Sequence, residues 1–150
     1  MLKTNLVPAF LIFSILVLTS ATPAKDQLAE DVLKYTNQYR RSKGLAAFEM
    51  RSDLNVIAQK HSEDMASGRR SFGHDGYNQR VTKIRKIIKE GDGYVAENVA
   101  YGANTAKEAF TIWKNSSGHR KNMLGNYKYI GIGTARNKRG VVYYTEIFVR

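Results

Sequence analysis

Two segments near the end of the chain constrain the fold most strongly. Residues 129–135 and 141–149 alternate in polarity and are rich in β-branched and aromatic side chains, which is typical of β-strands. Residues 137–140 read Asn-Lys-Arg-Gly, a sequence typical of a hairpin turn. Residues 95–101 predict one further strand. The rest of the chain must therefore supply apolar cover for a small antiparallel sheet.

The other segments have helical periodicity. Leu28, Val32, Tyr35 and Tyr39 recur at spacings of three and four and form one apolar stripe. The expected helices are residues 27–43, one that Ser52 caps and Gly68 ends, residues 78–89, one that the capping box Thr105–Glu108 opens and that runs through Trp113, and a short one that Ser117 caps and that ends near Gly125. This order predicts an α+β domain, a three-layer α-β-α sandwich whose sheet is flanked by helices.

The first two dozen residues differ from the rest. A short polar start with Lys3 leads into an apolar run from Leu6 to Leu18, and small residues follow. This order is typical of a secretory signal peptide, cut after Ala21 or Ala24. A membrane anchor is the alternative, but the run is shorter than the roughly 20 residues that a spanning helix needs. We therefore expect residues 1–24 to be a signal peptide and residues 25–150 to form one secreted or periplasmic domain without a transmembrane segment.

The chain contains 24 Lys and Arg against 13 Asp and Glu, and it has no cysteine. Without disulfides, an exported domain must rely on its hydrophobic core. The basic residues cluster at Arg40 to Lys43, at Arg69 and Arg70, and in residues 78–89. Such clusters favour anionic partners such as lipid headgroups or wall polymers, or they form a solvated face with no partner. No nucleic-acid-binding motif accompanies them, and export argues against that partner.

Three ionisable residues with apolar neighbours are candidates for a site: His74, Glu97 and His119. A carboxylate is rarely buried unpaired, so Glu97 needs His74 or His119 as a partner, or else a nearby Lys or Arg. Two imidazoles and a carboxylate together can hold a divalent cation or polarise a water. The alternatives are that His74 only orders its loop through a hydrogen bond and that His119 is structural.

The third histidine, His61, provides a contrast. It shares an apolar helix face with Ala58 and Met65, so we expect a core histidine that a hydrogen bond satisfies. Trp113 has helical spacing with Phe110 and is also expected in the core. Most of the nine tyrosines fall in amphipathic elements, which places them at the edges of the sheet and core rather than on a carbohydrate-binding surface.

Several short motifs occur in a characteristic order along the chain. They are Asn37-x-x-Arg40, Phe72-Gly73-His74, Glu97-Asn98 and Trp113-x-x-Ser116-x-Gly118-His119-Arg120-x-Asn122. Their order and wording resemble the CAP superfamily, also called the SCP-like family. The resemblance covers nearly the whole mature chain. Because many eukaryotic members are rich in disulfides, the absence of cysteine resembles the compact bacterial branch.

The resemblance also implies a set of site residues. In the family, two His and two Glu line a central cavity, and His74, Glu97 and His119 match three of them. Ser116 stands at the position of the second Glu, and Glu146 on the last strand is a candidate substitute. With one carboxylate fewer, the resemblance implies weak Zn²⁺ binding through His74 and His119, with Glu97 as a ligand or as the group that orients one ring. The alternative is a metal-free cluster in which Glu97 bonds directly to one ring.

The resemblance carries no agreed reaction, so two functions are considered, of which a binding module is favoured. The first is a secreted binding module for a small hydrophobic, lipid-like or sterol-like ligand, or for an extracellular surface, with a groove lined by His74, Glu97, Ser116 and His119. The second is a metal-assisted hydrolase or protease, in which His74 and His119 hold Zn²⁺ and Glu97, the candidate catalytic residue, activates a water. Both functions are compatible with the sequence.

Overall fold

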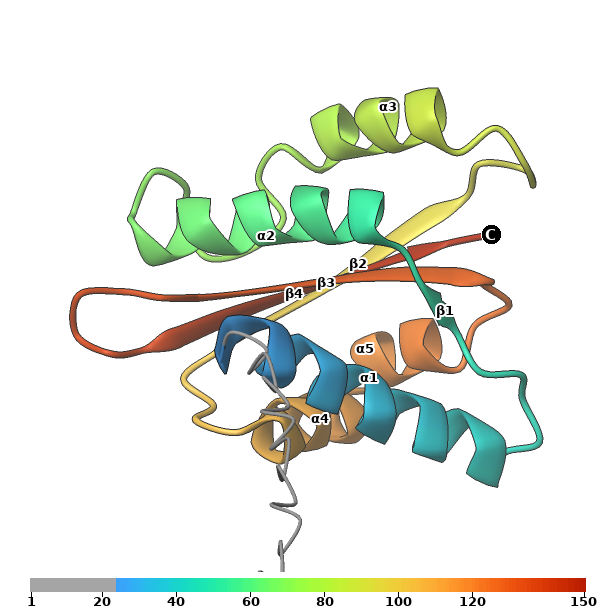
Figure 1. The fold of residues 1–150 in the computed structure, drawn as a ribbon, viewed down its shortest axis with the longest axis horizontal. Coiled ribbons are helices and arrows are strands. Elements are labelled where there is room, and N and C mark those ends of the chain that lie inside the picture. The colour runs from blue at the N-terminus through green and yellow to red at the C-terminus, as the bar shows by residue number, and fades with distance from the viewer. Residues whose placement is uncertain (1–23) are drawn as a thin grey trace, which may run out of the picture.

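A computed structural model describes residues 24–150 of the chain, which form three layers (Figure 1). Helices α2 and α3 lie on one face of a sheet, and α1, α4 and α5 lie on the other. The helices are α1 (Ala24–Ser42), α2 (Ser52–Ala66), α3 (Tyr77–Ile87), α4 (Ala106–Asn115) and α5 (Ser117–Met123). The strands are β1 (Glu49–Met50), β2 (Val95–Tyr101), β3 (Tyr129–Arg136) and β4 (Val142–Val149). The predicted α-β-α sandwich is confirmed.

The sheet has the strand order β1-β3-β4-β2. The pairs β3–β4 and β2–β4 are antiparallel, as expected, but β1 joins β3 in parallel, so the sheet is mixed. Strand β1 consists of only two residues, too few to show an alternating pattern in the sequence. In this order β4, the last described element, lies between β3 and β2 and pairs with both.

Side chains alternate between the two faces of the sheet and build a separate core on each. The face under α1 and α4 buries Trp113, Tyr144 and Phe148. The face under α2 and α3 buries a smaller cluster that includes Leu54 and Ile147. The core position expected for Trp113 is confirmed, and its indole Nε1 donates to the carbonyl oxygen of Val99 over 3.1 Å.

The predicted helix starts are confirmed in one case and corrected in two. Thr105 and Glu108 form the reciprocal capping box that opens α4. Ser52 and Ser117, by contrast, are the first residues of α2 and α5, and no side chain caps either helix. The difference is one residue at each start, where helix boundaries are least defined by sequence.

Two glycines of β3 let helix α2 lie directly against the sheet. A Cβ on Gly133 would come within 2.2 Å of the backbone nitrogen of Gln59, and one on Gly131 within 2.5 Å of the carbonyl carbon of Leu54. Any larger residue would have to push the helix away from the strand. The close approach lets Ser62 of α2 donate to the carbonyl oxygen of Gly133 over 2.9 Å.

The first basic cluster is not a uniformly charged face, because Arg40 is buried. Its guanidinium donates to the carbonyl oxygens of Ala46 over 2.7 Å and of Met123 and Gly125 over 2.9 Å each. The guanidinium carbon also lies 3.7 Å from the centre of the Phe48 ring. Arg40 thus ties the loop after α1 to the end of α5, two segments far apart in the sequence.

The described residues contain no helix that is both long enough and apolar enough to cross a membrane. The expected signal peptide, residues 1–24, lies outside the described part of the chain apart from Ala24, which begins α1.

Candidate functional site

The buried carboxylate of Glu97 is the centre of the candidate site. Glu97 lies on β2, and its side chain is only 2% exposed. One oxygen, Oε1, lies 2.9 Å from Nδ1 of His74, which is the partner that the sequence predicts. The other predicted kind of partner, a local cation, is present as well. The guanidinium of Arg80 donates from Nε to Oε2 over 2.6 Å and from Nη2 to Oε1 over 2.7 Å.

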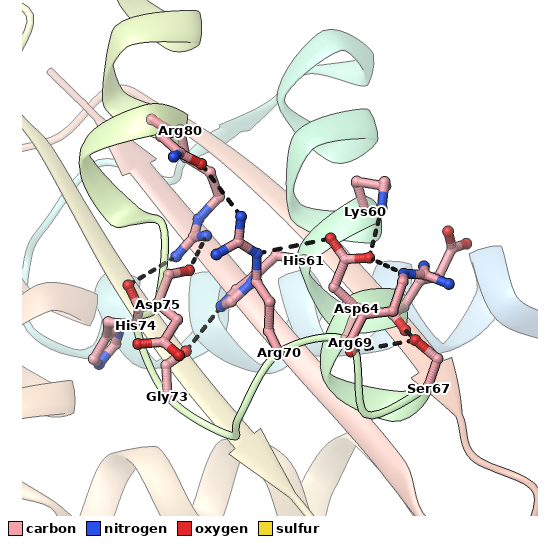
Figure 2. A network of polar contacts seen from close by, with 12 residues as sticks. Lys60, His61, Asp64, Ser67, Arg69, Arg70, Gly73, His74, Asp75 and Arg80 are labelled. Atoms are coloured by element: carbon pink, nitrogen blue, oxygen red, sulfur yellow. Dashed lines mark hydrogen bonds and ion pairs between the residues drawn. The ribbon is translucent and has the colours of Figure 1, made fainter.

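Arg80 is held in place by more than this carboxylate. It lies on α3, is nearly buried, and its Nη1 donates to the carbonyl oxygen of Asp75 over 2.8 Å. The residues around this guanidinium, including His61, His74 and Asp75, converge between α2, α3 and the loop that joins them (Figure 2). The pair Arg80–Glu97 is therefore a nearly buried ion pair, and a backbone carbonyl helps to hold its guanidinium in place.

His61 is the core histidine that the sequence predicts. It is 2% exposed, and its Nε2 lies 2.8 Å from the carbonyl oxygen of Gly73, so this nitrogen carries the proton. The same nitrogen is 3.8 Å from Oε1 of Glu97. Burial, followed by the nearby charge of Arg80, lowers the pKa of His61. A neutral ring beside the ion pair is consistent with both effects.

His119 lies on α5 and approaches the site from the other side of β2. The backbone carbonyl of His119 accepts from the amide of Asn98 over 3.2 Å, and Asn122 of the same helix donates to Oδ1 of Asn98 over 2.9 Å. Burial and the proximity of His74 lower the pKa of His119. Its Nδ1 is buried and has no hydrogen-bond partner. His119 is thus near His74 in electrostatic terms but is not bonded to Glu97.

Glu146 does not replace the second carboxylate of the family beside Glu97. In the register of β2 and β4, Glu146 pairs with Asn98 and therefore shares its face, whereas Glu97 points to the opposite face. The carboxyl of Glu146 accepts from Asn98 over 3.1 Å and from Thr36 of α1 over 3.2 Å. Complete burial raises its pKa to about 8. Glu146 is therefore mostly protonated at neutral pH and belongs to a separate polar network.

Ser116 lies at the junction of α4 and α5. Its backbone nitrogen donates to the carbonyl oxygen of Trp113 over 3.2 Å, and its own carbonyl oxygen accepts from Arg120 over 2.9 Å. Its side chain does not cap α5. The contacts that place Ser116 are therefore backbone contacts of the helix junction.

The donor atoms present give limited support to a metal site. Among residues 24–150, no group of three or more His, Cys, Asp and Glu side chains is arranged to hold a metal ion. Both oxygens of Glu97 already accept from Arg80, whose charge opposes a second cation beside it. The expected Zn²⁺ site is thereby reduced to the imidazoles of His74 and His119, and it stays a prediction.

A groove opens between α2 and α3, next to the Arg80–Glu97 pair. It encloses about 470 Å³ and is lined by His61 and Arg80, but not by His74, Glu97 or His119. Its apolar part is Val56 and Ile57, and Val56 is 70% exposed. Its charged part is Lys60, Asp64, Arg70, Arg80 and Lys83, of which four are cations. In Figure 2 the side chains of Lys60, Asp64 and Arg70 lie between α2 and Arg80.

The sequence analysis did not identify Arg80 as the partner of Glu97, because it placed Arg80 only in a basic cluster. Tyr77, Arg80 and Ile84 recur at helical spacing, and Arg80 and Ile84 are buried. A cation on an apolar helix stripe needs a carboxylate, and that signal points to Glu97.

The chain matches the family model CAP, described as the Cysteine-rich secretory protein family, over residues 33–148. Two curated proteins of Bacillus subtilis (strain 168) are similar to it. The uncharacterized protein YkwD is 32% identical over 120 residues, which are 77% of this chain and 45% of that protein. The uncharacterized membrane protein YlbC is 31% identical over 125 residues, which are 81% of this chain and 34% of that protein. The chain thus spans less than half the length of either relative.

Solved structures show the same fold. An extracellular protein containing a SCP domain from Bacillus anthracis str. Ames has a TM-score of 0.71 at 26% identity, over 84% of this chain and 41% of that one. A cysteine-rich secretory protein from Staphylococcus aureus subsp. aureus Mu50 has a TM-score of 0.67 at 25% identity, over 85% and 40%. An outer surface protein from Borrelia burgdorferi, with a TM-score of 0.68 at 17% identity over 79% and 91%, shares the fold alone.

Proposed function

Because the chain belongs to the CAP family of cysteine-rich secretory proteins, we propose that it is an extracytoplasmic domain that binds a small anionic, lipid-like molecule. The binding site of this proposal is the groove between α2 and α3. An apolar tail would lie against Val56 and Ile57, and an anionic head would meet Lys83 and Arg70.

The location outside the cytoplasm has two supports. The apolar run of residues 6–18 and the small residues after it have the order of a signal peptide. Two similar structures are described as an extracellular protein and a cysteine-rich secretory protein. The relative YlbC is described as a membrane protein, which is also compatible with a domain outside the cytoplasm.

The observation that carries the ligand class is the composition of the groove. Its volume of about 470 Å³ lies within the usual range for small-molecule sites, roughly 300–1,000 Å³. Cations outnumber carboxylates four to one in its lining, and an exposed Val56 stands among them. Arg80 is paired with Glu97, and Lys60 and Arg70 share Asp64, so the lining keeps an excess of positive charge that an anionic head would offset, while a tail would cover the exposed valine.

The rival function, a metal-assisted hydrolase or protease, has less support. Such a reaction needs Glu97 to accept a proton from water, but both of its oxygens accept hydrogen bonds from Arg80. A base in that position is bound to a fixed cation and is poorly placed to turn toward a water. Hydrolysis of a general protein or ester substrate that is lost in both His74→Ala and His119→Ala would support this rival.

The proposal is tested by titrating the purified chain with cis-parinaric acid, a fluorescent fatty acid. We expect saturable binding that palmitate displaces and that uncharged hexadecanol displaces less well. Lys83→Glu should weaken binding roughly two- to fivefold or more, because it inverts a charge at the groove. The matched control is Lys86→Glu, which makes the same charge change on the same helix outside the groove lining.

Two results would contradict the proposal. The first is fluorescence no greater than that of a neutral control domain of similar size, which would remove the ligand class. The second is equal weakening by Lys83→Glu and Lys86→Glu, which would show a general charge effect and remove the groove as the site.

A further inference from the structure

Three aromatic side chains form an exposed cluster at the end of the sheet that carries the turn between β3 and β4. Phe72 is 46% exposed and Tyr101 is 54% exposed, yet their ring centres are only 4.6 Å apart. The rings of Tyr101 and Tyr143 are stacked, with centres 5.7 Å apart and planes at 21°. Both tyrosines lie on strands of the sheet, as expected for most tyrosines of the chain, but Tyr101 also presents an exposed ring. Exposed aromatic faces in contact with one another are a binding surface in many soluble proteins.

The strand register places this cluster in a row that crosses the sheet. Tyr101 of β2 pairs with Tyr143 of β4, and Tyr143 pairs with Ala135 of β3. Paired residues share a face of the sheet and neighbouring strands lie about 4.8 Å apart, so the row spans about 10 Å. That length suits an elongated ligand that lies across the strands.

The two end residues of this row each also line a cavity. Tyr101 lines a cavity of about 730 Å³, together with the polar side chains of Thr105, Glu108 and Thr111. Ala135 lines a second cavity, of about 610 Å³. The cavity at Ala135 is also lined by α2 and lies on the same face as the rings, whereas the cavity at Tyr101 is lined by the start of α4, on the other side of the sheet.

The second cavity is strongly basic. Its lining includes the four cations Arg69, Arg136, Lys138 and Arg139, against the single carboxylate of Glu63. Lys138 and Arg139 lie in the turn between β3 and β4 and are exposed. This end of the row is complementary to an anionic group.

We propose that the aromatic cluster, together with the basic cavity at Lys138 and Arg139, binds a sugar chain that carries anionic groups. Sugar rings have apolar faces of C–H bonds, which pack on the negative faces of Tyr101, Tyr143 and Phe72. Their acidic groups match the cations at Lys138 and Arg139, and a part of the sugar chain that passes the edge strand at Tyr101 would meet the hydroxyls of Thr105 and Thr111. This site is separate from the α2–α3 groove, so either proposal can fail without the other.

The interleaving of polar and aromatic groups favours a sugar over an apolar protein partner. Two of the three rings carry hydroxyls, and charged or hydroxylated side chains line both adjoining cavities. A stable protein interface needs an apolar centre of several hundred Å², larger than three rings supply. A sugar chain needs only a few stacked rings with polar groups around them.

The experiment is calorimetric titration of the purified chain with three probes. They are a hexamer of galacturonic acid, which is anionic, a hexamer of N-acetylglucosamine, which is neutral, and short poly-glutamate, which is anionic but has no sugar ring. We expect the galacturonate hexamer to bind most tightly and poly-glutamate to bind least. Tyr101→Ala and Phe72→Ala should each weaken galacturonate binding about tenfold.

Two control variants separate stacking and charge from general effects. Tyr94→Ala removes an equally exposed ring, 52% exposed and stacked on Tyr127, which is not part of the row. It should leave binding unchanged. The double variant Lys138→Glu/Arg139→Glu should weaken galacturonate binding. Its control is Lys86→Glu/Lys89→Glu, which makes the same change in net charge on and beside α3 and should leave binding unchanged.

The proposal is overturned by any of three results. The first is that poly-glutamate binds as tightly as the galacturonate hexamer. The second is that Tyr101→Ala and Phe72→Ala bind galacturonate like the unchanged protein while their thermal unfolding is normal. The third is that the protein dimerises through Phe72, as shown by sedimentation of the unchanged protein and Phe72→Ala, because a second copy would then occupy the row.

Discussion

Arg80 of α3 holds Glu97 of β2 with two hydrogen bonds, from Nε to Oε2 over 2.6 Å and from Nη2 to Oε1 over 2.7 Å. The carboxylate side chain is 2% exposed and the arginine side chain 9%. The ion pair therefore joins α3 to the edge strand of the sheet in a nearly buried position. Its energetic role can be measured by removing one partner or both.

Arg80→Ala should lower the free energy of unfolding by about 3 kcal/mol or more, because it leaves a buried carboxylate without its cation. Urea unfolding followed by circular dichroism measures this change. The control is Lys86→Ala, an exposed cation on the same helix, which should change the free energy by less than about 0.5 kcal/mol. The double variant Arg80→Met/Glu97→Leu should recover most of the lost free energy of unfolding, because no charge is then buried without its partner. An equal loss of stability in Arg80→Ala and in the double variant would contradict an ion-pair role.

The buried carboxyl of Glu146 should make stability fall as pH rises. Its pKa is raised from 4.5 to about 8, so between these values the folded chain keeps a proton that the unfolded chain has lost. The free energy of unfolding should then decrease by about 1.4 kcal/mol per pH unit relative to a variant that does not titrate. Glu146→Gln is that variant, and urea unfolding from pH 5 to pH 8 provides the comparison.

The comparison with Glu146→Gln also removes the opposite effect of two histidines. His61 and His119 have pKa values lowered by burial, so below about 6.5 they stabilise the fold less as pH falls. The unchanged protein and Glu146→Gln both contain these two histidines, so the contribution of the histidines cancels in the comparison. Parallel stability curves for the unchanged protein and Glu146→Gln would contradict a raised pKa at Glu146.

The pKa of His119 should rise when His74 is replaced. Burial is the main cause of its lowered pKa, and the charge of His74 is the second. His74→Gln removes that charge, and NMR titration of the ring nitrogens should show His119 titrating at higher pH. If His119 does not shift, the two rings are too far apart to form one site.

Zn²⁺ binding, if it involves the predicted residues, should depend on His74 and His119 and should be weak. Only neutral imidazole binds the metal, so protons compete with it and uptake should decrease as the pH is lowered. Titration calorimetry at pH 7.5 and pH 5.5 measures this, with Glu146→Gln as a control that leaves both rings in place. Equal uptake by the unchanged protein and by His74→Ala/His119→Ala would show that the rings are not metal ligands.

Gly133→Ala should destabilise the fold by about 1–3 kcal/mol, because the added methyl group would meet the backbone of α2 at 2.2 Å. Thermal unfolding or urea unfolding measures the loss. Gly118→Ala is the matched control, since a Cβ there meets nothing within 4 Å and its backbone is helical. Equal effects at the two positions would show that the approach of α2 to β3 is not tight.

The layers of the fold could be predicted because periodicity reports which face of each element is buried. Val95–Tyr101 was predicted at its observed bounds, and α4 began after the expected capping box. The mixed sheet could not be predicted, because a strand of two residues has no measurable pattern. Tertiary pairing, not local sequence, makes Glu49 and Met50 a strand.

The candidate site could be predicted only in part. His74 does contact Glu97, but sequence alone does not give the register between β2 and β4, so the face of Glu146 was unknown. A shift of one residue would have placed Glu146 on the side of Glu97. The aromatic cluster was missed for the same reason, since Tyr101 and Tyr143 become neighbours only through that register.

The position of β4 determines the order in which the domain can assemble. Strand β2 pairs only with β4 in the described sheet, and β4 (residues 142–149) is the last of the described strands along the chain. Until that segment is available, β2 has no partner and each core lacks part of its wall. The described residues consequently cannot close their sheet progressively from the amino-terminal side, because β2 and both cores wait for β4.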